Sequence, residues 1–129
     1  MNQPGVVAVD ESRPIFVQIA EQIENDIIAG TLPEETQVPS TNEFAAFLRI
    51  NPATAGKGVG LLVDAGILYK KRGIGMFVAE GARARLVGER RERFRDQYLA
   101  PLLAEARKLG IDDAQLVHLI TDISPEKES

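Results

Sequence analysis

Apolar residues recur at steps of three and four along residues 14–29, which is the spacing of one buried helix face. Pro14 suits the first turn, where its missing N–H has no helical partner, and Gly30 suits the end. We therefore predict a helix over this range. Its apolar stripe consists of Phe16, Ile19, Ala20, Ile23 and Ile27.

Two shorter helical patterns follow, with a gap of about three or four residues between them. The first begins at Ser40, and Glu43 three positions later completes the pattern of a capping box. The second begins at Asn51-Pro52, a cap followed by the residue best suited to the first helical position, and ends at Gly66. This layout is typical of a helix-turn-helix. The predicted buried sides are Phe44, Ala45, Phe47 and Leu48 in the first helix and Ala55, Val59, Leu62 and Val63 in the second.

Residues 67–71 and 76–79 read as two strands around the tip Arg72-Gly73-Ile74-Gly75. The two glycines permit the positive φ angles that a tight hairpin needs. A hairpin directly after a helix-turn-helix predicts a wing. We therefore predict a winged helix-turn-helix domain over residues 13–80, preceded by a flexible arm at residues 1–12.

A long helical pattern covers residues 82–109, in which Pro101 should produce a kink, and Asp112 can cap a last short helix. One kinked helix and one short helix cannot bury both of their sides alone, so we predict that residues 81–124 form a two-helix dimerisation region with an apolar seam between two copies. Residues 125–129 are predicted to be a disordered tail. Val87 belongs to the apolar face of the long helix, and the predicted seam consists of Phe94, Tyr98, Leu102, Ala106, Leu116, Leu119 and Ile120.

The fold class predicted from these patterns is mainly α with a small β-hairpin: a winged helix-turn-helix domain plus a short C-terminal helical dimerisation unit. The 129 residues suit one modest core with an appended element. The chain has no cysteine, no secretion signal pattern and no apolar run near the roughly 18 residues that span a bilayer. These features predict a cytoplasmic protein without a membrane partner.

The charge distribution favours nucleic acid although the chain has a net charge of −4. DNA binding requires a local basic surface, because neutralising phosphates releases counterions. Between residues 49 and 75, five basic residues stand against the single acid Asp64. The five basic residues are Arg49, Lys57, Lys70, Lys71 and Arg72.

The second short helix should lie in the major groove with its N-terminal residues toward the base edges. Thr54 and Lys57 offer donors, the methyl groups of Ala53 and Thr54 suit thymine, and an asparagine such as Asn51 suits adenine unless it is used as a cap. The free N–H groups behind the Ser40 cap suit a phosphate, and Arg72 suits a narrow minor groove. The complete predicted DNA-binding set is Ser40, Thr41, Asn42, Asn51, Pro52, Ala53, Thr54, Lys57, Lys70, Lys71, Arg72 and Gly73.

Other kinds of site are poorly supported. The glycines of residues 56–60 lack the spacing of a nucleotide-binding loop and fall inside a helix pattern. His118, the single histidine, lies near Asp122, but a partly exposed polar side chain explains it better than a metal site. An arginine cluster at residues 90–95 reads as a solvated helix face rather than a second DNA surface, because residues 82–129 hold equal numbers of acids and bases. We predict no enzyme activity, no cofactor and no metal.

Three blocks of the sequence resemble the N-terminal domain of GntR-type bacterial transcription regulators over residues 13–79. These are PIFVQIAEQIENDIIAGTL, VPSTNEFAAFL and NPATAGKGVGLLVDAGILYKKRGIGMFV. The segment RRERFRDQYLAPLLAEARKLGID is similar to the YtrA subfamily. That resemblance implies two helices after the wing that form a homodimer, and usually a repressor, often associated with genes for ABC-type transporters.

Several positions depart from the family pattern. Many members carry arginine where this chain has Asn42, Pro52 and Gly56, although Lys57 stands beside the last of these. Gly73 matches the glycine of the family's wing, with Arg72 before it. These departures bear on which operator is read more than on whether DNA is bound.

We therefore predict a homodimeric transcriptional repressor that binds a pseudo-palindromic operator in double-stranded DNA. The alternative is an adaptor whose winged helix docks protein without binding DNA. A small-molecule effector bound between subunits is left open, because no polar cluster in the sequence marks a pocket for it.

Overall fold

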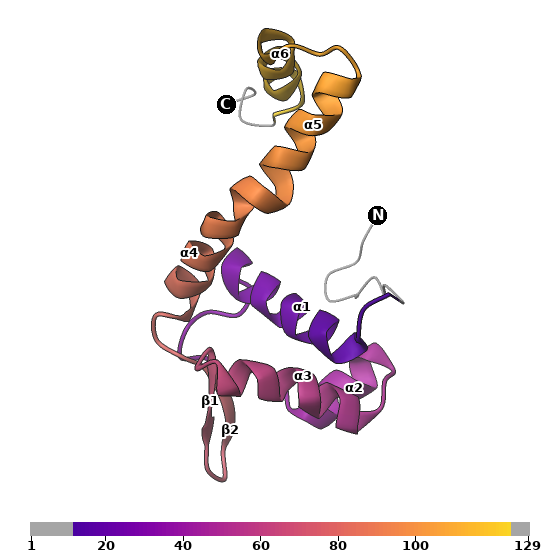
Figure 1. The fold of residues 1–129 in the computed structure, drawn as a ribbon. Coiled ribbons are helices and arrows are strands. Elements are labelled where there is room, and N and C mark those ends of the chain that lie inside the picture. The colour runs from indigo at the N-terminus through magenta and orange to yellow at the C-terminus, as the bar shows by residue number, and fades with distance from the viewer. Residues whose placement is uncertain (1–11, 125–129) are drawn as a thin grey trace. The chain divides into compact units, whose positions relative to one another are not determined.

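The computed structural model describes residues 12–124, so the predicted tail and all of the predicted arm except Ser12 lie outside the described residues. It confirms a mainly α fold with a small hairpin (Figure 1). The chain divides into two compact units between residues 88 and 89. The elements are α1 (Ile15–Ala29), α2 (Thr41–Leu48), α3 (Pro52–Asp64), β1 (Leu68–Lys71), β2 (Gly75–Val78), α4 (Ala82–Phe94), the π-helical turn η1 (Arg95–Leu99), α5 (Ala100–Lys108) and α6 (Asp113–Ile123).

The first unit is built around α1, which lies across α3 in Figure 1. Ile19, Ile23 and Ile27 are each 1% exposed, and burying such a side chain contributes about 1.5–3 kcal/mol. Phe16, at the start of the stripe, is only half-buried. The other buried members of the core are Ala20, Val38, Val59, Leu62, Ile67, Leu68, Val78, Ala82 and Leu86.

The start of α4 belongs to the first unit, because Ala82 and Leu86 are each 2% exposed within this core. The predicted apolar face of the long helix included Val87, which is half-buried, but it did not include Ala82 or Leu86. The compact unit therefore continues past residue 80, where the sequence pattern places the end of the winged domain.

The helices α1 and α3 approach each other closely at Gly58. A Cβ atom at this position would lie 2.8 Å from the carbonyl oxygen of Phe16 and 3.0 Å from Cγ2 of Ile19. Glycine in a helix interior costs about 1 kcal/mol relative to alanine, so packing against α1 must offset this cost. The absence of a side chain at Gly58 lets the backbone of α1 come this near.

The buried side predicted for α2 is confirmed for Ala45, which is 4% exposed, and Phe44 and Leu48 are half-buried. The prediction is wrong for Phe47, which is 64% exposed. The reason is geometric: α2 has eight residues, and Phe47 stands at the side of the α1–α2 crevice instead of entering the core.

The wing is a two-stranded antiparallel sheet whose register runs from Leu68 opposite Val78 to Lys71 opposite Gly75. Each strand begins one residue away from its predicted start, a usual difference at element ends. The loop between α1 and α2 also pairs with the sheet. Gln37 of this loop forms a bridge with Phe77, and the N–H of Val38 donates to the carbonyl of Met76 at 2.9 Å. This loop therefore fixes the hairpin from one side.

The long helix predicted over residues 82–109 is α4, η1 and α5 in succession. At Pro101, where we predicted a kink, the structure has a π-helical turn just before the proline, and the N–H of Ala100 donates to the carbonyl of Arg95, five residues back. A π turn is one way in which a helix accommodates a local disturbance of its hydrogen-bond ladder. Asp112 caps α6 as predicted, and Gln115 completes a capping box with it. Within residues 12–124, no helix has both the length and the apolar character that crossing a membrane requires.

Candidate nucleic-acid interface

The N-terminus of α2 is formed by the predicted capping box. The N–H of Glu43 donates to Oγ of Ser40 at 3.1 Å, and the N–H of Ser40 donates to Oε1 of Glu43 at 2.7 Å. The first two helical N–H groups, those of Thr41 and Asn42, have no acceptor within a helix. Positive N–H groups at an exposed helix start suit a phosphate oxygen. Ser40 and Asn42 are exposed, and Thr41 is half-buried.

The N-terminus of α3 exposes Asn51, Pro52 and Ala53 and half-buries Thr54. Oδ1 of Asn51 accepts a hydrogen bond from the N–H of Ala53 at 2.8 Å, so the side chain is used as a helix cap. A bidentate pair with adenine needs both the oxygen and the nitrogen of the amide. The structure therefore forms the cap that the sequence predicts at this helix start.

Lys57 lies one turn further along α3 from Ala53 and is exposed, as expected for a contact with DNA. Its ammonium nitrogen lies 4.8 Å from the centroid of the Phe16 ring, which belongs to α1. At an exposed position, such a cation–π contact contributes about 0.5–1 kcal/mol. The contact directs the side chain of Lys57 toward the side of α3 that faces α1.

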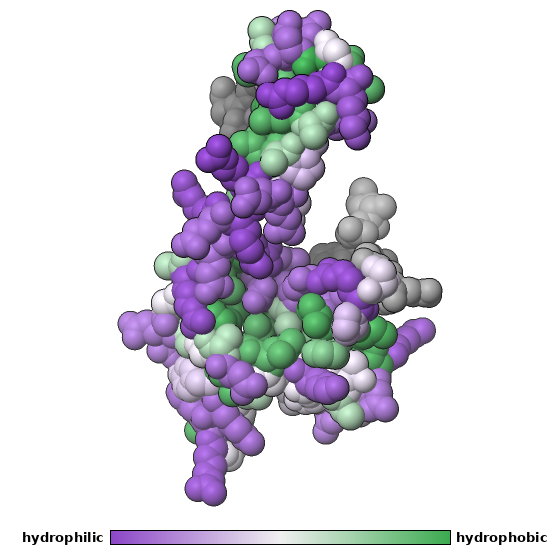
Figure 2. Space-filling model, in the orientation of Figure 1, coloured by the Kyte–Doolittle hydropathy of each residue, from purple (hydrophilic) through white to green (hydrophobic). Residues whose placement is uncertain are grey.

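The four wing residues predicted to contact DNA are all exposed: Lys70, Lys71, Arg72 and Gly73. The N–H of Ile74 donates to the carbonyl of Lys71 at 2.9 Å and closes the turn, and Gly73 within it has a φ of 76°. In Figure 2 most of the visible surface of the hairpin is hydrophilic. The hairpin thus presents a basic tip to solvent.

The two lysines of β1 point to opposite faces of the hairpin, as strand alternation requires. Lys71 shares a face with Tyr69 and Phe77, whose rings stack with centroids 6.0 Å apart. Its ammonium nitrogen lies 4.4 Å from the centroid of the Phe77 ring. Lys70 lies on the opposite face, where its strand partner is Met76.

Two residues of the loop before α2 support the wing, and sequence reasoning missed both. Nε2 of Gln37 donates to the carbonyl of Ile74 at 3.0 Å and packs over Gly75, where a Cβ atom would lie 2.4 Å away. The hydroxyl of Tyr69 donates to Oε1 of Glu35, and this hydrogen bond raises the pKa of Tyr69. The one feature of the sequence that indicates this contact is the glycine at position 75. In the structure Gly75 has a φ of 146°, and its lack of a side chain makes room for Gln37.

The residues of the predicted seam divide into two groups. Ala106 and Leu116 are 5% and 9% exposed, so they are already buried within one chain. Five others keep between 43% and 60% of their surface exposed, and the rings of Phe94 and Tyr98 lie 5.8 Å apart. These five are Phe94, Tyr98, Leu102, Leu119 and Ile120.

His118 and Asp122 occupy one exposed face of α6, with Nε2 and Oδ2 3.9 Å apart. Their side chains are 81% and 54% exposed. Among the described residues, no group of three or more His, Cys, Asp or Glu residues is arranged to hold a metal ion. The segment Gly56–Gly60 lies inside α3, where a nucleotide-binding loop has no place.

Comparison with known proteins places these features in a family. The model described as "Bacterial regulatory proteins, gntR family" matches residues 16–78. The HTH-type transcriptional repressor YtrA of Bacillus subtilis is 30% identical over 115 residues, which cover 89% of this chain and 88% of YtrA. This match covers more of the chain than the family model does and extends beyond the winged domain.

Solved structures agree with the sequence matches. A GntR family transcriptional regulator from Listeria monocytogenes is 26% identical with a TM-score of 0.71, covering 90% of this chain and 100% of that one. The DNA-binding domain of AraR, solved in complex with an operator, is 32% identical with a TM-score of 0.51, covering 55% of this chain and 87% of that one. The chain therefore belongs to the GntR family of bacterial regulatory proteins, with a similarity to YtrA along most of its length.

Proposed function

We propose that this chain is a transcriptional repressor that binds a pseudo-palindromic operator as a homodimer. The observation that carries the proposal is the joint exposure, on the first unit, of two capped helix N-termini and a basic hairpin tip. The repressor YtrA and the operator complex of the AraR domain support the assignment. Repression is a property of YtrA, and operator binding is a property of the AraR domain. We extend both properties to this chain.

Each part of the surface has a distinct proposed role. The N–H groups at the start of α2 hold one phosphate and set the register on the duplex. Thr54 and Lys57, with the methyl group of Ala53, read the major groove. Arg72 enters the minor groove beside Gly73, and Gln37 positions the wing for this contact.

We assign DNA binding to residues 13–80 and dimerisation to residues 81–124. The five exposed apolar residues of the seam support the second assignment, because an exposed face of this kind marks a surface for association. A two-fold dimer presents two reading heads, whose half-sites should lie about one helical turn apart, or a multiple of it. A bacterial regulator with this function acts in the cytoplasm, beside the chromosome.

The first test is selection of bound fragments from genomic DNA with the full-length protein. We expect an inverted-repeat motif, and removing the protein from cells should raise transcription of the genes beside the selected sites. Duplex binding should weaken steeply as salt rises, because counterions are released at the phosphates. Affinity that is negligible even at low salt would instead favour the protein-docking adaptor.

The second test uses Lys57→Ala and Arg72→Ala, measured by fluorescence anisotropy on the selected operator. Each should weaken binding, and a lysine or arginine that contacts only phosphate lowers the salt slope by about one. Lys108→Ala is the matched control, since Lys108 is exposed in the second unit and lies 3.9 Å from Glu105. If both variants bind like the wild type, the proposed reading face is incorrect.

A further inference from the structure

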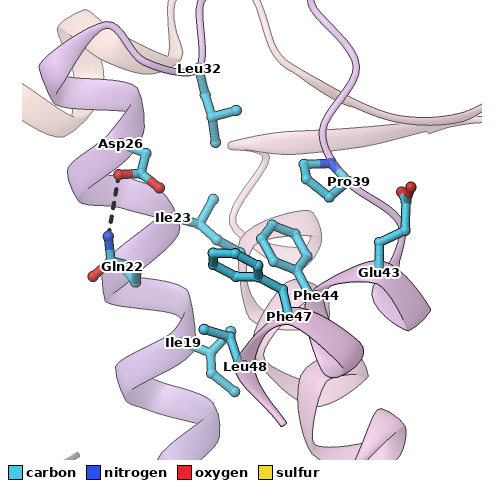
Figure 3. A pocket seen from close by; sticks show the side chains of 10 residues that line it. All are labelled: Ile19, Gln22, Ile23, Asp26, Leu32, Pro39, Glu43, Phe44, Phe47 and Leu48. Carbon is cyan, nitrogen blue, oxygen red and sulfur yellow. Dashed lines mark hydrogen bonds between the residues drawn. The ribbon is translucent and has the colours of Figure 1, made fainter. Parts of the chain in front are cut away.

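A pocket of about 230 Å³ lies between α1 and α2, within the first unit (Figure 3). Figure 3 shows the rings of Phe44 and Phe47 on the α2 side and Ile19 and Ile23 on the α1 side. Leu32, Pro39 and Leu48 complete the apolar lining. The volume lies below the range of about 300–1,000 Å³ that is usual for drug-sized ligands, so an occupant would be small.

Two carboxylates border this apolar space from opposite sides, Asp26 on α1 and Glu43 on α2 (Figure 3). Asp26 accepts one hydrogen bond, from Nε2 of Gln22 at 3.2 Å, and Glu43 accepts one from the N–H of Ser40 at 2.7 Å. Within the described part of the chain, neither carboxylate forms a salt bridge. Burial raises the pKa of Asp26, although the hydrogen bond from Gln22 lowers it in part. The pocket therefore combines apolar walls with a carboxylate at each edge, and among residues 12–124 no cation pairs with either carboxylate.

This combination of groups selects a ligand by its charge. A carboxylate beside an apolar wall is stabilised by a cation more than by a neutral group, because the low local dielectric strengthens the attraction. The faces of Phe44 and Phe47 also attract a cation, since aromatic rings are negative at their faces. An anionic ligand would be repelled by the two carboxylates, and a purely apolar one would gain nothing from them.

We propose that this pocket binds a small organic cation, an amine or alkylammonium ion with an apolar body. The body lies against Phe44, Phe47 and Ile23, and the ammonium group lies at Asp26 or Glu43. This inference concerns α1, α2 and the segment between them, and it stands whether or not the protein binds DNA.

The test titrates the full-length protein with 2-phenylethylamine, which carries an aromatic ring and an ammonium group. Isothermal titration calorimetry gives the Kd, and backbone amide NMR shifts locate the site. We expect the largest shifts in α1 and α2 around Ile23 and Phe44. Phenylacetate, which has the same ring with a negative charge, should bind at least about tenfold more weakly.

Isosteric variants test the role of each carboxylate. Glu43→Gln retains an acceptor for the N–H of Ser40, because glutamine also completes a capping box, and Asp26→Asn retains an acceptor for Gln22. At least one of the two variants should raise the Kd of 2-phenylethylamine about tenfold, as the loss of a charge-assisted contact predicts. Glu80→Gln, an exposed acid of the same unit outside the pocket lining, should leave the Kd unchanged.

Three results would overturn the proposal. The first is the absence of amide shifts in α1 and α2 at millimolar amine. The second is equal affinity for phenylacetate, or unchanged affinity in both carboxylate variants. The third is dissociation of a dimer by Phe47→Ser in light scattering, because the pocket would then be a contact with a second copy of the chain.

Discussion

The two units of the molecule bury their apolar residues to very different degrees. In the first unit, isoleucines of α1, the inner side of α3, the hairpin and the start of α4 share one core. Within residues 89–124 of the second unit, the buried hydrophobic residues are Ala106 and Leu116. Large apolar side chains such as Phe94, Tyr98 and Leu102 remain exposed there, and so does Ile123.

The difference teaches what each unit requires to be stable. A domain is stabilised by the apolar surface that it removes from water, and the first unit does this within one chain. The second unit leaves much of its apolar surface exposed, which is typical of helices that complete their burial against another chain. We therefore expect the first unit to respond to changes in its core and the second to changes on its surface.

The largest effect is expected from Ile23→Ala, which removes a side chain that is 1% exposed in the first unit. The free energy of unfolding should fall by about 2–5 kcal/mol, measured by urea denaturation. Ile123→Ala is the matched control, because Ile123 is 82% exposed in the second unit, and its change should stay within about 0.5 kcal/mol. Similar losses in the two variants would contradict the proposed difference between the units.

The next effect concerns association of the second unit. Phe94→Asp places a charge in the predicted seam, where Phe94 is 57% exposed in the single chain. Loss of an aromatic anchor of an interface costs about 2 kcal/mol or more, so light scattering should report half the dimer mass at micromolar protein. Val117→Asp, at a residue 61% exposed and outside the predicted seam, should leave the dimer intact. A Phe94→Asp protein that remains dimeric would place the seam elsewhere.

A smaller effect tests the close packing of the first unit. Gly58→Ala adds a methyl group that meets the backbone of α1, so the free energy of unfolding should fall by about 1–3 kcal/mol. Gly60→Ala, two positions along the same helix, meets nothing within 4 Å and should raise it by about 0.5–1 kcal/mol. Thermal unfolding followed by circular dichroism measures both. Changes of equal sign would show that α1 and α3 are not packed as described.

The smallest effect is a pH dependence that belongs to the first unit. The pKa of Asp26 is raised above its ordinary value of 3.8 in the folded chain, so the folded state holds this proton more tightly than the unfolded state. The resulting stabilisation is fully present below that ordinary value and is lost as pH rises through the raised value. Stability relative to Asp26→Asn should therefore decline across this window in urea titrations. Parallel stability curves for the two proteins would contradict the shift.

Most of the first unit was predictable because its signals are local. The capping box of Ser40 and Glu43, the Asn51-Pro52 start and the glycines of the tip act over a few residues, and their elements lie within a residue or two of the predicted limits. Phe47 was misplaced because a helical pattern gives the direction of a side chain but not whether a neighbour covers it. The sequence did not predict that Leu86 is buried, because the apolar positions of the long helix indicate a face that contains its neighbour Val87.

The support of the wing illustrates what local patterns leave out. Gln37 bonds to Ile74, 37 positions further along the chain, and Glu35 accepts a bond from Tyr69 across 34 positions. No periodicity links residues so far apart, since α2 and α3 lie between them along the chain. Most of the predicted contacts with DNA, in contrast, are exposed side chains near the starts of α2 and α3 and in the hairpin, so their positions follow from the local elements.

The sequence by itself determined the order of the elements, the exposed basic tip and the membership in a regulator family. Caps, turns and hydrophobic periodicity depend only on residues that lie close together in the sequence. Only the tertiary structure decided the support of the wing by Gln37 and the pocket between α1 and α2. It also separated the seam residues already buried within one chain from those that remain exposed. These features depend on which side chains meet across long separations, and close packing in three dimensions settles that.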